Sequence, residues 1–277
     1  MRFISIHVLL LISALNVRAQ YPDSPGPATK TSFTWPEGKK MALSLTFDDA
    51  RPSQVDNGIP ILDSYGVKAT FYVTPGRIDE RLSGWKSAVE NGHEIGNHTL
   101  NHPCSGNFPW ARHKSLEGMR LRDIAREIEG ADEAIESLLG VTPETFAYPC
   151  GQTFVGRGAG LQSYIPLIHT LYLAGRCWMS EGPNDPVFCD PANLFAVELD
   201  GKDFDEVLQI ISGASESGSW LILAGHEIGN PGSQTTWEST LEQICKYAGD
   251  PENGIWIAPV NTIVKYISEN VHRPHRK

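Results

Sequence analysis

The stretch "ALSLTFDDA", residues 42–50, is apolar for most of its length and then ends on two adjacent carboxylates, Asp48 and Asp49. The apolar run predicts a buried strand. Two like charges at the end of such a strand repel each other, and they are costly to desolvate unless a cation compensates them. A solvated turn would also explain the pair. Other parts of the sequence are therefore needed to distinguish a turn from a functional site that holds a cation.

Strand-like segments alternate with helical patterns along the chain. We predict strands at residues 42–47, 69–74, 94–97, 145–148, 194–199, 220–223 and 255–258. The clearest helical pattern covers residues 121–138, where apolar residues recur every three or four positions before Gly140. This alternation favours a parallel sheet with crossover helices, either closed as a TIM-like barrel or open as a doubly wound sheet. In both folds ligands bind at the carboxyl ends of the strands, where the two aspartates lie.

Composition and the N-terminal segment indicate an exported protein. The chain has 277 residues and a formal net charge of −10, which argues against nucleic acid or an anionic membrane as partner. Residues 1–19 combine an early Arg, a short apolar run and a small-residue cleavage site, so we predict a signal peptide and a secreted or periplasmic location. Residues 20–40 read as an extended lead-in to a single domain at residues 41–277. No later stretch is long and apolar enough to span a membrane.

The five cysteines also suit an oxidising compartment. Their odd number leaves at least one outside any bridge within the chain. A Cys177–Cys189 bridge could close the loop between these residues, but the sequence does not establish the pairing. No C-x-x-C occurs, so we do not expect a thiolate zinc site.

A second informative stretch, "GHEIGNHTLNHP", covers residues 92–103. His98 and His102 are four residues apart, so a turn or short helix brings both imidazoles to the same side, and Pro103 disfavours a longer helix. Two neutral imidazoles and one carboxylate are the donor set of a catalytic zinc site. Such an ion would also explain the aspartate pair, because one carboxylate binds it while the other stays ionised beside it as a general base.

A third stretch, "WLILAGHEIG" at residues 220–229, places Gly225 and His226 at the end of another apolar strand. A hydrolase with an amine or alcohol leaving group needs a proton donor opposite its base, and histidine titrates in the useful range. A surface histidine after a strand is equally common, so this signal depends on the other two.

The stretches "TFDD", "HTLNHP" and "LILAGH" resemble the first, second and fifth motifs of the NodB-type polysaccharide deacetylases, carbohydrate esterase family 4, and occur in the family's order. The resemblance spans about residues 43–226. It implies an α/β fold, a single-domain distorted TIM-like (β/α)7 barrel, with one divalent metal ion, usually Zn²⁺. It also implies removal of N- or O-acetyl groups from chitin oligomers, peptidoglycan, poly-N-acetylglucosamine or xylan.

Matched positions in the motifs imply a role for each residue. Asp48 corresponds to the catalytic base, and Asp49, His98 and His102 correspond to the metal ligands. His226 corresponds to the general acid. The implied mechanism is metal-assisted hydrolysis, in which water attacks the acetyl carbonyl and the acid protonates the departing nitrogen or oxygen.

The third and fifth motifs depart from the family pattern. The third reads roughly F-R-P-P-Y-G in the family and "FAYPCG" here, so Ala147 replaces the base-orienting Arg and Cys150 replaces the oxyanion-hole Tyr. Cys150 can still supply the backbone N–H that does this work, and Arg176 at a later strand end is a candidate for the missing guanidinium. Gly225 stands where a Leu is expected, which predicts a wider acetyl pocket.

The proton-donating histidine of the fifth motif also needs a carboxylate partner. Asp200 and Asp203, in "ELDGKD", are the candidates. Each is equally typical of a turn or a helix cap.

Three functions are therefore compared. The favoured one is an exported, metal-dependent deacetylase acting on a carbohydrate polymer. The second is a C–N hydrolase acting on a small amide, which the altered third motif and Gly225 keep open because fold and motifs do not determine the substrate. The third is a non-catalytic sugar-binding relic that has lost its arginine. The presence of Asp48 and His226 argues against the relic, since a protein that only binds sugar needs neither.

Overall fold

The computed structural model describes residues 33–271. The predicted signal peptide and most of the predicted lead-in lie outside these residues. The end of the lead-in packs on the domain, because the Trp35 side chain is buried and its Nε1 donates a hydrogen bond to the Gly218 carbonyl at 2.9 Å. No helix within the described residues has both the length and the apolar character needed to cross a bilayer.

The main sheet of the described residues has eight strands. They are β1 (Met41–Asp48), β2 (Thr70–Val73), β3 (Glu94–Asn97), β4 (Thr145–Ala147), β7 (Ala174–Arg176), β8 (Val197–Glu198), β9 (Trp220–Gly225) and β12 (Ile255–Ile257). The α-helices are α1 (Ile59–Ser64), α2 (Leu82–Glu90), α3 (Leu121–Leu139), α4 (Ile165–Leu171), α5 (Phe204–Ser217), α6 (Glu238–Gly249) and α7 (Val260–Asn270).

The strands run parallel in the order β7-β4-β3-β2-β1-β9-β8. The first half of β1 also pairs with β12, while its second half pairs with β2. At the other end of this order, Leu194, just before β8, bridges to Arg176 at the end of β7. The sheet therefore curls until its two edges meet, and the predicted distorted (β/α)7 barrel is confirmed.

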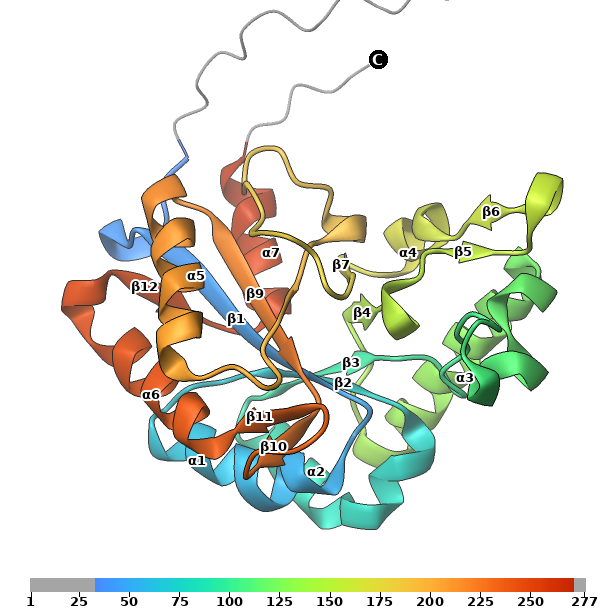
Figure 1. Cartoon of the computed structure of the whole chain (residues 1–277), viewed down its shortest axis with the longest axis horizontal. Helices are drawn as coiled ribbons and strands as arrows, with labels where there is room; N and C mark the ends of the chain where they lie inside the picture. Colours follow the sequence, from blue (N-terminus) through green and yellow to red (C-terminus); the bar gives the residue numbers. More distant parts are fainter. Residues whose placement is uncertain (1–32, 272–277) are drawn as a thin grey trace, which may run out of the picture. The chain divides into compact units, whose positions relative to one another are not determined.

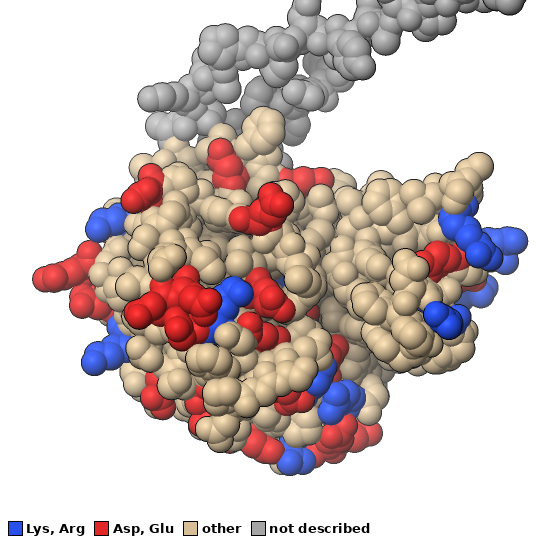
Figure 2. All heavy atoms as spheres, in the orientation of Figure 1, with Lys and Arg blue, Asp and Glu red and all other residues tan. Residues whose placement is uncertain are grey.

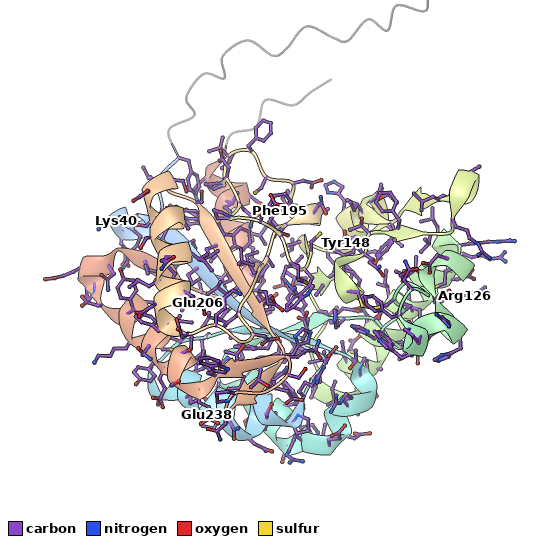
Figure 3. All side chains as sticks on the ribbon, in the orientation of Figure 1. Lys40, Arg126, Tyr148, Phe195, Glu206 and Glu238 are labelled. Carbon is purple, nitrogen blue, oxygen red and sulfur yellow. A yellow bond between two sulfur atoms is a disulfide. The ribbon has the colours of Figure 1, made fainter. Side chains whose placement is uncertain are left out.

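The core lies between the strands and the surrounding helices (Figure 1). All eight residues of β1 are buried, as expected for a central strand covered on both faces. The largest apolar cluster joins β1, β2 and β9 to α1, α2, α5 and α6. Side chains fill the interior throughout, including Tyr148, which is 1% exposed and donates a hydrogen bond to the Ala192 carbonyl at 2.6 Å (Figure 3).

The ends of two long helices follow local signals in the sequence. α3 buries one apolar face and ends at Gly140, whose φ of 72° is left-handed and favours glycine. This end of the helix is the predicted one. α5 begins after Asp203, whose carboxylate accepts a hydrogen bond from the Glu206 amide at 2.9 Å in a capping box.

Several elements were not predicted. They include α4, α7, β7 and two small two-stranded sheets, β5 (Phe154–Val155) with β6 (Gln162–Ser163) and β10 (Glu227–Gly229) with β11 (Thr235–Trp237). The predicted strand at residues 194–199 contributes only two residues to β8. Apart from α7, these segments are too short to show a clear hydrophobic period, and their pairing is set by neighbours distant in sequence. α7 has 11 residues and buries Val260, Ile263, Val264 and Ile267 at helical spacing, so its signal was present in the sequence and was overlooked.

Candidate active site

The side chains singled out in the sequence converge at the carboxyl ends of the strands. Asp48 ends β1, Arg176 ends β7 and His226 directly follows β9. His98 follows β3, and Cys150 lies in the loop after β4. A cavity of about 540 Å³ at this end is lined by Asp48, Asp49, His98, His102, Cys150 and His226. Arg176 is completely buried beneath it.

A sharp backbone turn separates the two aspartates. Asp49 and Ala50 have φ values of 77° and 53°, which are unusual for residues with a Cβ and occur mainly at functional sites. The Asp49 amide donates to the Tyr72 carbonyl at 3.0 Å, which holds the turn against β2. As a result, one carboxylate faces an arginine and the other faces two histidines.

Asp48 is held by Arg176. Its carboxylate is 3% exposed, and the Arg176 Nη2 lies 2.5 and 2.6 Å from its two oxygens. In the pairing of β4 with β7, Ala147 is directly opposite Arg176. The guanidinium absent from the third motif is therefore present one strand further on, at the same level of the barrel.

Asp49, His98 and His102 form a compact cluster of donor atoms. The Asp49 Oδ1 lies 3.7 Å from the His98 Nε2 and 3.6 Å from the His102 Nε2. Zinc bonds of about 2.0–2.1 Å in a tetrahedron would place donor atoms about 3.3 Å apart, so little movement is needed. The His98 Nδ1 donates to the Ala147 carbonyl at 2.8 Å, which leaves the lone pair of its Nε2 facing the cluster.

The charges in this cluster suit a divalent cation. Burial raises the pKa of Asp49, but His98, His102 and Arg51 outweigh it and bring this pKa to about 2. Burial and the neighbouring His98 lower the pKa of His102 to about 4. At neutral pH the cluster therefore offers an ionised carboxylate and an uncharged His102 imidazole, as zinc requires.

Arg51 is a site residue that sequence reasoning missed. Its Nη2 bonds the Asp49 Oδ2 at 2.9 Å, and its Nη1 bonds Glu227 at 3.1 Å. Only the other oxygen of Asp49 is then left to face the histidines. The available signal was a cation two residues after the aspartate pair, and nothing in the sequence shows where such a side chain points.

His226 has a carboxylate partner, and of the two candidates it is Asp200. The His226 Nδ1 donates to the Asp200 Oδ2 at 2.7 Å, whereas Asp203 caps α5. Burial alone would lower the pKa of His226, but the hydrogen bond to Asp200 and the charges of Asp48 and Asp49 raise it above 6.5. The His226 ring also packs edge-on against Trp178, with ring centroids 4.7 Å apart.

The prediction that Gly225 widens the acetyl pocket is wrong. A Cβ at this position would lie 2.2 Å from the Thr236 Oγ1 and 2.8 Å from the Asp200 Oδ1. Thr236 donates to the same Asp200 oxygen at 2.9 Å. The missing side chain therefore makes room for the network that supports His226, not for substrate.

A disulfide joins two loops of the site. Cys104, two residues after His102, is bonded to Cys150, a pairing that the sequence did not indicate. The Cys177 Sγ, considered for a bridge to Cys189, instead lies 3.0 Å from the Asn193 Oδ1. The Cys104–Cys150 bridge thus ties the histidine loop to the loop that follows β4.

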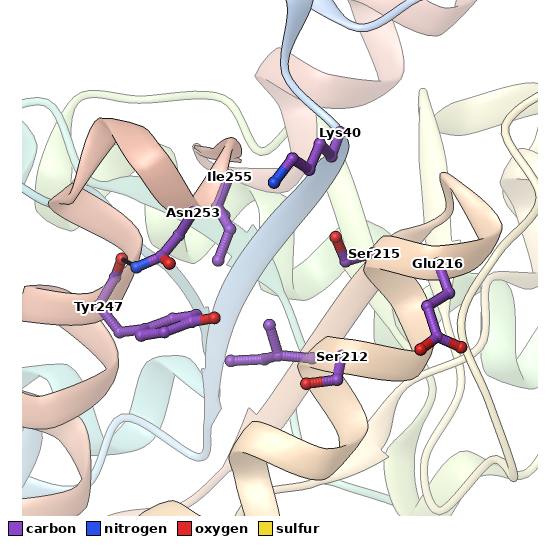
Figure 4. A pocket seen from close by; sticks show the side chains of 8 residues that line it. Lys40, Ser212, Ser215, Glu216, Tyr247, Asn253 and Ile255 are labelled. Atoms are coloured by element: carbon purple, nitrogen blue, oxygen red, sulfur yellow. Dashed lines mark hydrogen bonds between the residues drawn. The ribbon is translucent and has the colours of Figure 1, made fainter.

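A second hollow, shown in Figure 4, lies at the opposite end of the strands. Its volume is about 380 Å³, and its lining includes Lys40, Tyr247 and Ile255, close to the starts of β1 and β12. None of the predicted site residues lines it. Because parallel barrels carry their active sites at the carboxyl ends of the strands, the first cavity is the candidate active site.

The part of the chain that holds Asp48, Asp49, His98 and His102 matches a known protein family. Residues 36–155 match the sequence profile of the polysaccharide deacetylase family. The chain is 33% identical over 93 residues to the uncharacterised protein YlxY of Bacillus subtilis, covering 34% of this chain and 26% of YlxY. It is 28% identical over 148 residues to chitin deacetylase 1 of Cryptococcus neoformans, covering 53% of this chain and 29% of that protein.

A third relative is the peptidoglycan-N-acetylglucosamine deacetylase PgdA of Listeria monocytogenes, 28% identical over 110 residues, with 39% of this chain and 21% of PgdA covered. The matching segments thus span less than a third of the length of each of these relatives.

Solved structures share the fold at low sequence identity. A Mycobacterium smegmatis protein assigned to the polysaccharide deacetylases superimposes with a TM-score of 0.63 at 17% identity, covering 88% of this chain and 98% of that one. The Xyl-CE4 domain of a multidomain xylanase from the Trinervitermes trinervoides hindgut metagenome gives a TM-score of 0.53 at 21% identity, covering 82% and 91%. The motifs and residues 36–155 thus match the NodB-homology polysaccharide deacetylase family, and the described residues share the fold of solved structures named as polysaccharide deacetylases.

Proposed function

We propose that this protein is an exported, metal-dependent deacetylase that hydrolyses acetyl groups on a carbohydrate polymer. In this proposal Asp48 is the general base and His226 the general acid, and Asp49, His98 and His102 bind a divalent ion, most simply Zn²⁺. The observation that carries the proposal is that all five side chains line one cavity, with each proposed proton-transfer residue held by its own buried partner.

The chain's own residues suit hydrolysis of an acetyl group. A divalent ion, when bound, supplies Lewis-acid polarisation of the carbonyl and lowers the pKa of water. Asp48, aimed by Arg176, accepts the proton of the attacking water. The backbone N–H of Cys150 donates a hydrogen bond to the oxygen that becomes negatively charged. His226 then donates a proton to the departing nitrogen or oxygen, and its raised pKa favours the protonated form that this step needs.

Export and a glycan substrate rest on separate observations. Disulfides persist mainly in oxidising compartments, so the Cys104–Cys150 bridge agrees with the predicted signal peptide. Relatives named as chitin and peptidoglycan deacetylases support an acetylated hexosamine polymer as substrate.

The two alternative functions, a small-amide hydrolase and a non-catalytic sugar-binding relic, are less well supported. The small-amide hydrolase relied on the lost arginine and on Gly225, and the fold accounts for both, through Arg176 and through the space that Asp200 needs. The sugar-binding relic relied on the same lost arginine.

The test separates the two adjacent aspartates. Acetate release from chitin oligosaccharides, acetylxylan and peptidoglycan fragments is measured with and without chelator, and metal content is measured by mass spectrometry. We expect Asp48→Asn to keep the metal and lose turnover by about 10²–10⁴-fold, and Asp49→Ala to lose the metal. Asp203→Asn, at a helix cap away from the site, is the matched control and should keep both.

Two results would contradict the proposal. One is an Asp48→Asn variant without metal, which would show that the roles of the two aspartates are wrongly divided. The other is a metal-loaded wild-type protein that releases no acetate from any of these glycans.

A further inference from the structure

Large apolar side chains are exposed around the candidate active site. Phe108, Trp110 and Met179 are 42%, 54% and 65% exposed, and all three line the same cavity as Asp48 and His226. Exposed apolar groups gathered at one place indicate a binding surface. Sequence reasoning did not single out any of these three residues.

Phe108 and Trp110 form one wall of the cavity. Their ring centroids are 5.6 Å apart with the planes inclined by 20°, and Trp110 lies 6.1 Å from the His102 ring at an inclination of 30°. A short helix at Pro109–Lys114 holds the tryptophan in place. The rings thus present a nearly parallel series of flat faces that begins at the proposed metal ligand and leads outward from it.

Trp178 and Met179 form a second wall, just after β7. Trp178 contacts the His226 ring, the proposed proton donor, and Met179 is the more exposed of the two. Flat aromatic faces carry a partial negative charge and attract the C–H groups on the apolar face of a pyranose ring. Both walls line the cavity that holds Asp48 and His226, so a sugar chain with its acetylated unit at the reacting centre would meet them.

The charged groups in the cavity argue against an acidic glycan. Among the residues that line it, Arg51 is the only Lys or Arg, and it is already bonded to Asp49, Glu227 and Gln234. Arg112 and Lys114, which follow Trp110, bond the main-chain carbonyls of Gly106 and Asn101. Acidic side chains are also spread over the face of the molecule shown in Figure 2. Apart from the proposed metal ion and His226 at the reacting centre, a carboxylate on the sugar chain would therefore meet no free cation among the residues that line the cavity.

The geometry points to an uncharged oligosaccharide as the substrate, with the sugar next to the deacetylated unit stacked on the Phe108–Trp110 platform. This inference rests on the proposed deacetylase function and narrows its substrate class. The same surface disfavours glycans whose sugars carry lactyl or uronic carboxylates, because no lysine or arginine of the cavity is free to pair with them.

The first experiment measures kcat/KM for N-acetylglucosamine oligomers of two to six units. Wild-type kcat/KM should rise with chain length, and Trp110→Ala should reduce this rise about 10-fold through a higher KM. Trp110→Phe should restore most of it, because a flat ring remains. The matched control is Phe188→Ala, which removes an aromatic ring that is 87% exposed and does not line the cavity. If kcat/KM of Trp110→Ala rises with chain length as steeply as that of the wild type, the proposed stacking of the sugar on Phe108 and Trp110 is overturned.

The second experiment compares two oligomers of equal length, one uncharged and one carrying lactyl carboxylates on alternate sugars. We expect at least a 10-fold preference in kcat/KM for the uncharged oligomer, and a preference for the carboxylated one would overturn the charge argument. Calorimetric titration of the uncharged hexamer into Asp48→Asn separates the two proposals. If the hexamer binds, Trp110→Ala abolishes this binding and the wild-type protein releases no acetate, then the deacetylase function is refuted and the Phe108–Trp110 platform is kept. If the wild-type protein releases acetate but its kcat/KM does not depend on chain length, then the deacetylase function is kept and the platform is refuted.

Discussion

Replacing Arg176 with Met removes the positive charge beside the proposed base while keeping most of the side-chain volume. Arg176 is completely buried and Asp48 is 3% exposed, so water cannot take the place of the lost partner. Removing one member of a buried ion pair costs about 3–5 kcal/mol, because the other charge stays buried without compensation. For a domain of this size that corresponds to a fall in Tm of roughly 6–20 °C.

A double-mutant cycle tests where this cost comes from. The Asp48→Asn variant leaves the buried Arg176 charge unpaired, and Arg176→Met then removes that charge. Arg176→Met should therefore cost at least about 2 kcal/mol less in this background than in the wild type. Free energies of unfolding come from urea titration at pH 7. Arg81→Ala is the matched control, because Arg81 pairs with Asp56 at the surface at 2.7 Å and its loss should hardly change Tm.

Two outcomes would refute this reasoning. One is a cost below about 1 kcal/mol for Arg176→Met, which is the range of a surface pair. The other is an equal cost in both backgrounds, which would mean that Arg176 stabilises the fold through its packing and not through the charge of Asp48.

Three further predictions concern pH, the disulfide and the metal. The raised pKa of His226 keeps its acid form present above pH 6.5, so activity should fall as pH rises through that pKa. Asp200→Asn removes the hydrogen-bond partner and lowers this pKa, so the fall in kcat/KM should move to lower pH. A fall at the same pH in wild type and variant would contradict the pairing of His226 with Asp200. Replacing Cys104 and Cys150 together with Ser opens a link across 46 residues and should lower the free energy of unfolding by about 2–4 kcal/mol, measured by urea titration, whereas an unchanged midpoint would mean that the loops hold without it. Chelation should lower Tm and abolish acetate release, and added Zn²⁺ should restore both; activity that survives chelation would exclude the metal.

Local patterns in the sequence predict the central strands and the clearest helices. β1 and β9 follow from continuous apolar runs that end in polar residues, and α3 follows from its apolar spacing and from Gly140. Asp48 and His226 were singled out because each ends such a run. In these cases the signal and the structure lie within the same short segment.

Contacts between distant segments could not be predicted in the same way. The Cys104–Cys150 bridge depends on how two loops meet. The Phe108–Trp110 platform lies in a stretch without hydrophobic period, where an exposed aromatic cannot be distinguished from a buried one. Arg176 was proposed only as a candidate, because its position opposite Ala147 is set by the register between β4 and β7.

That register explains how an arginine on β7 can take the place of the arginine expected in the third motif on β4. Neighbouring parallel strands end at the same level of a barrel, so the residue opposite Ala147 reaches the same space from the side. The new position needs its own support: the Arg176 guanidinium lies 4.9 Å over the Tyr72 ring. That ring in turn needs Gly96, where a Cβ would lie 2.4 Å from it. Because Gly96 lies in the same stretch as the proposed histidine ligands, residues 92–103, this stretch supports the proposed base as well as the proposed metal site.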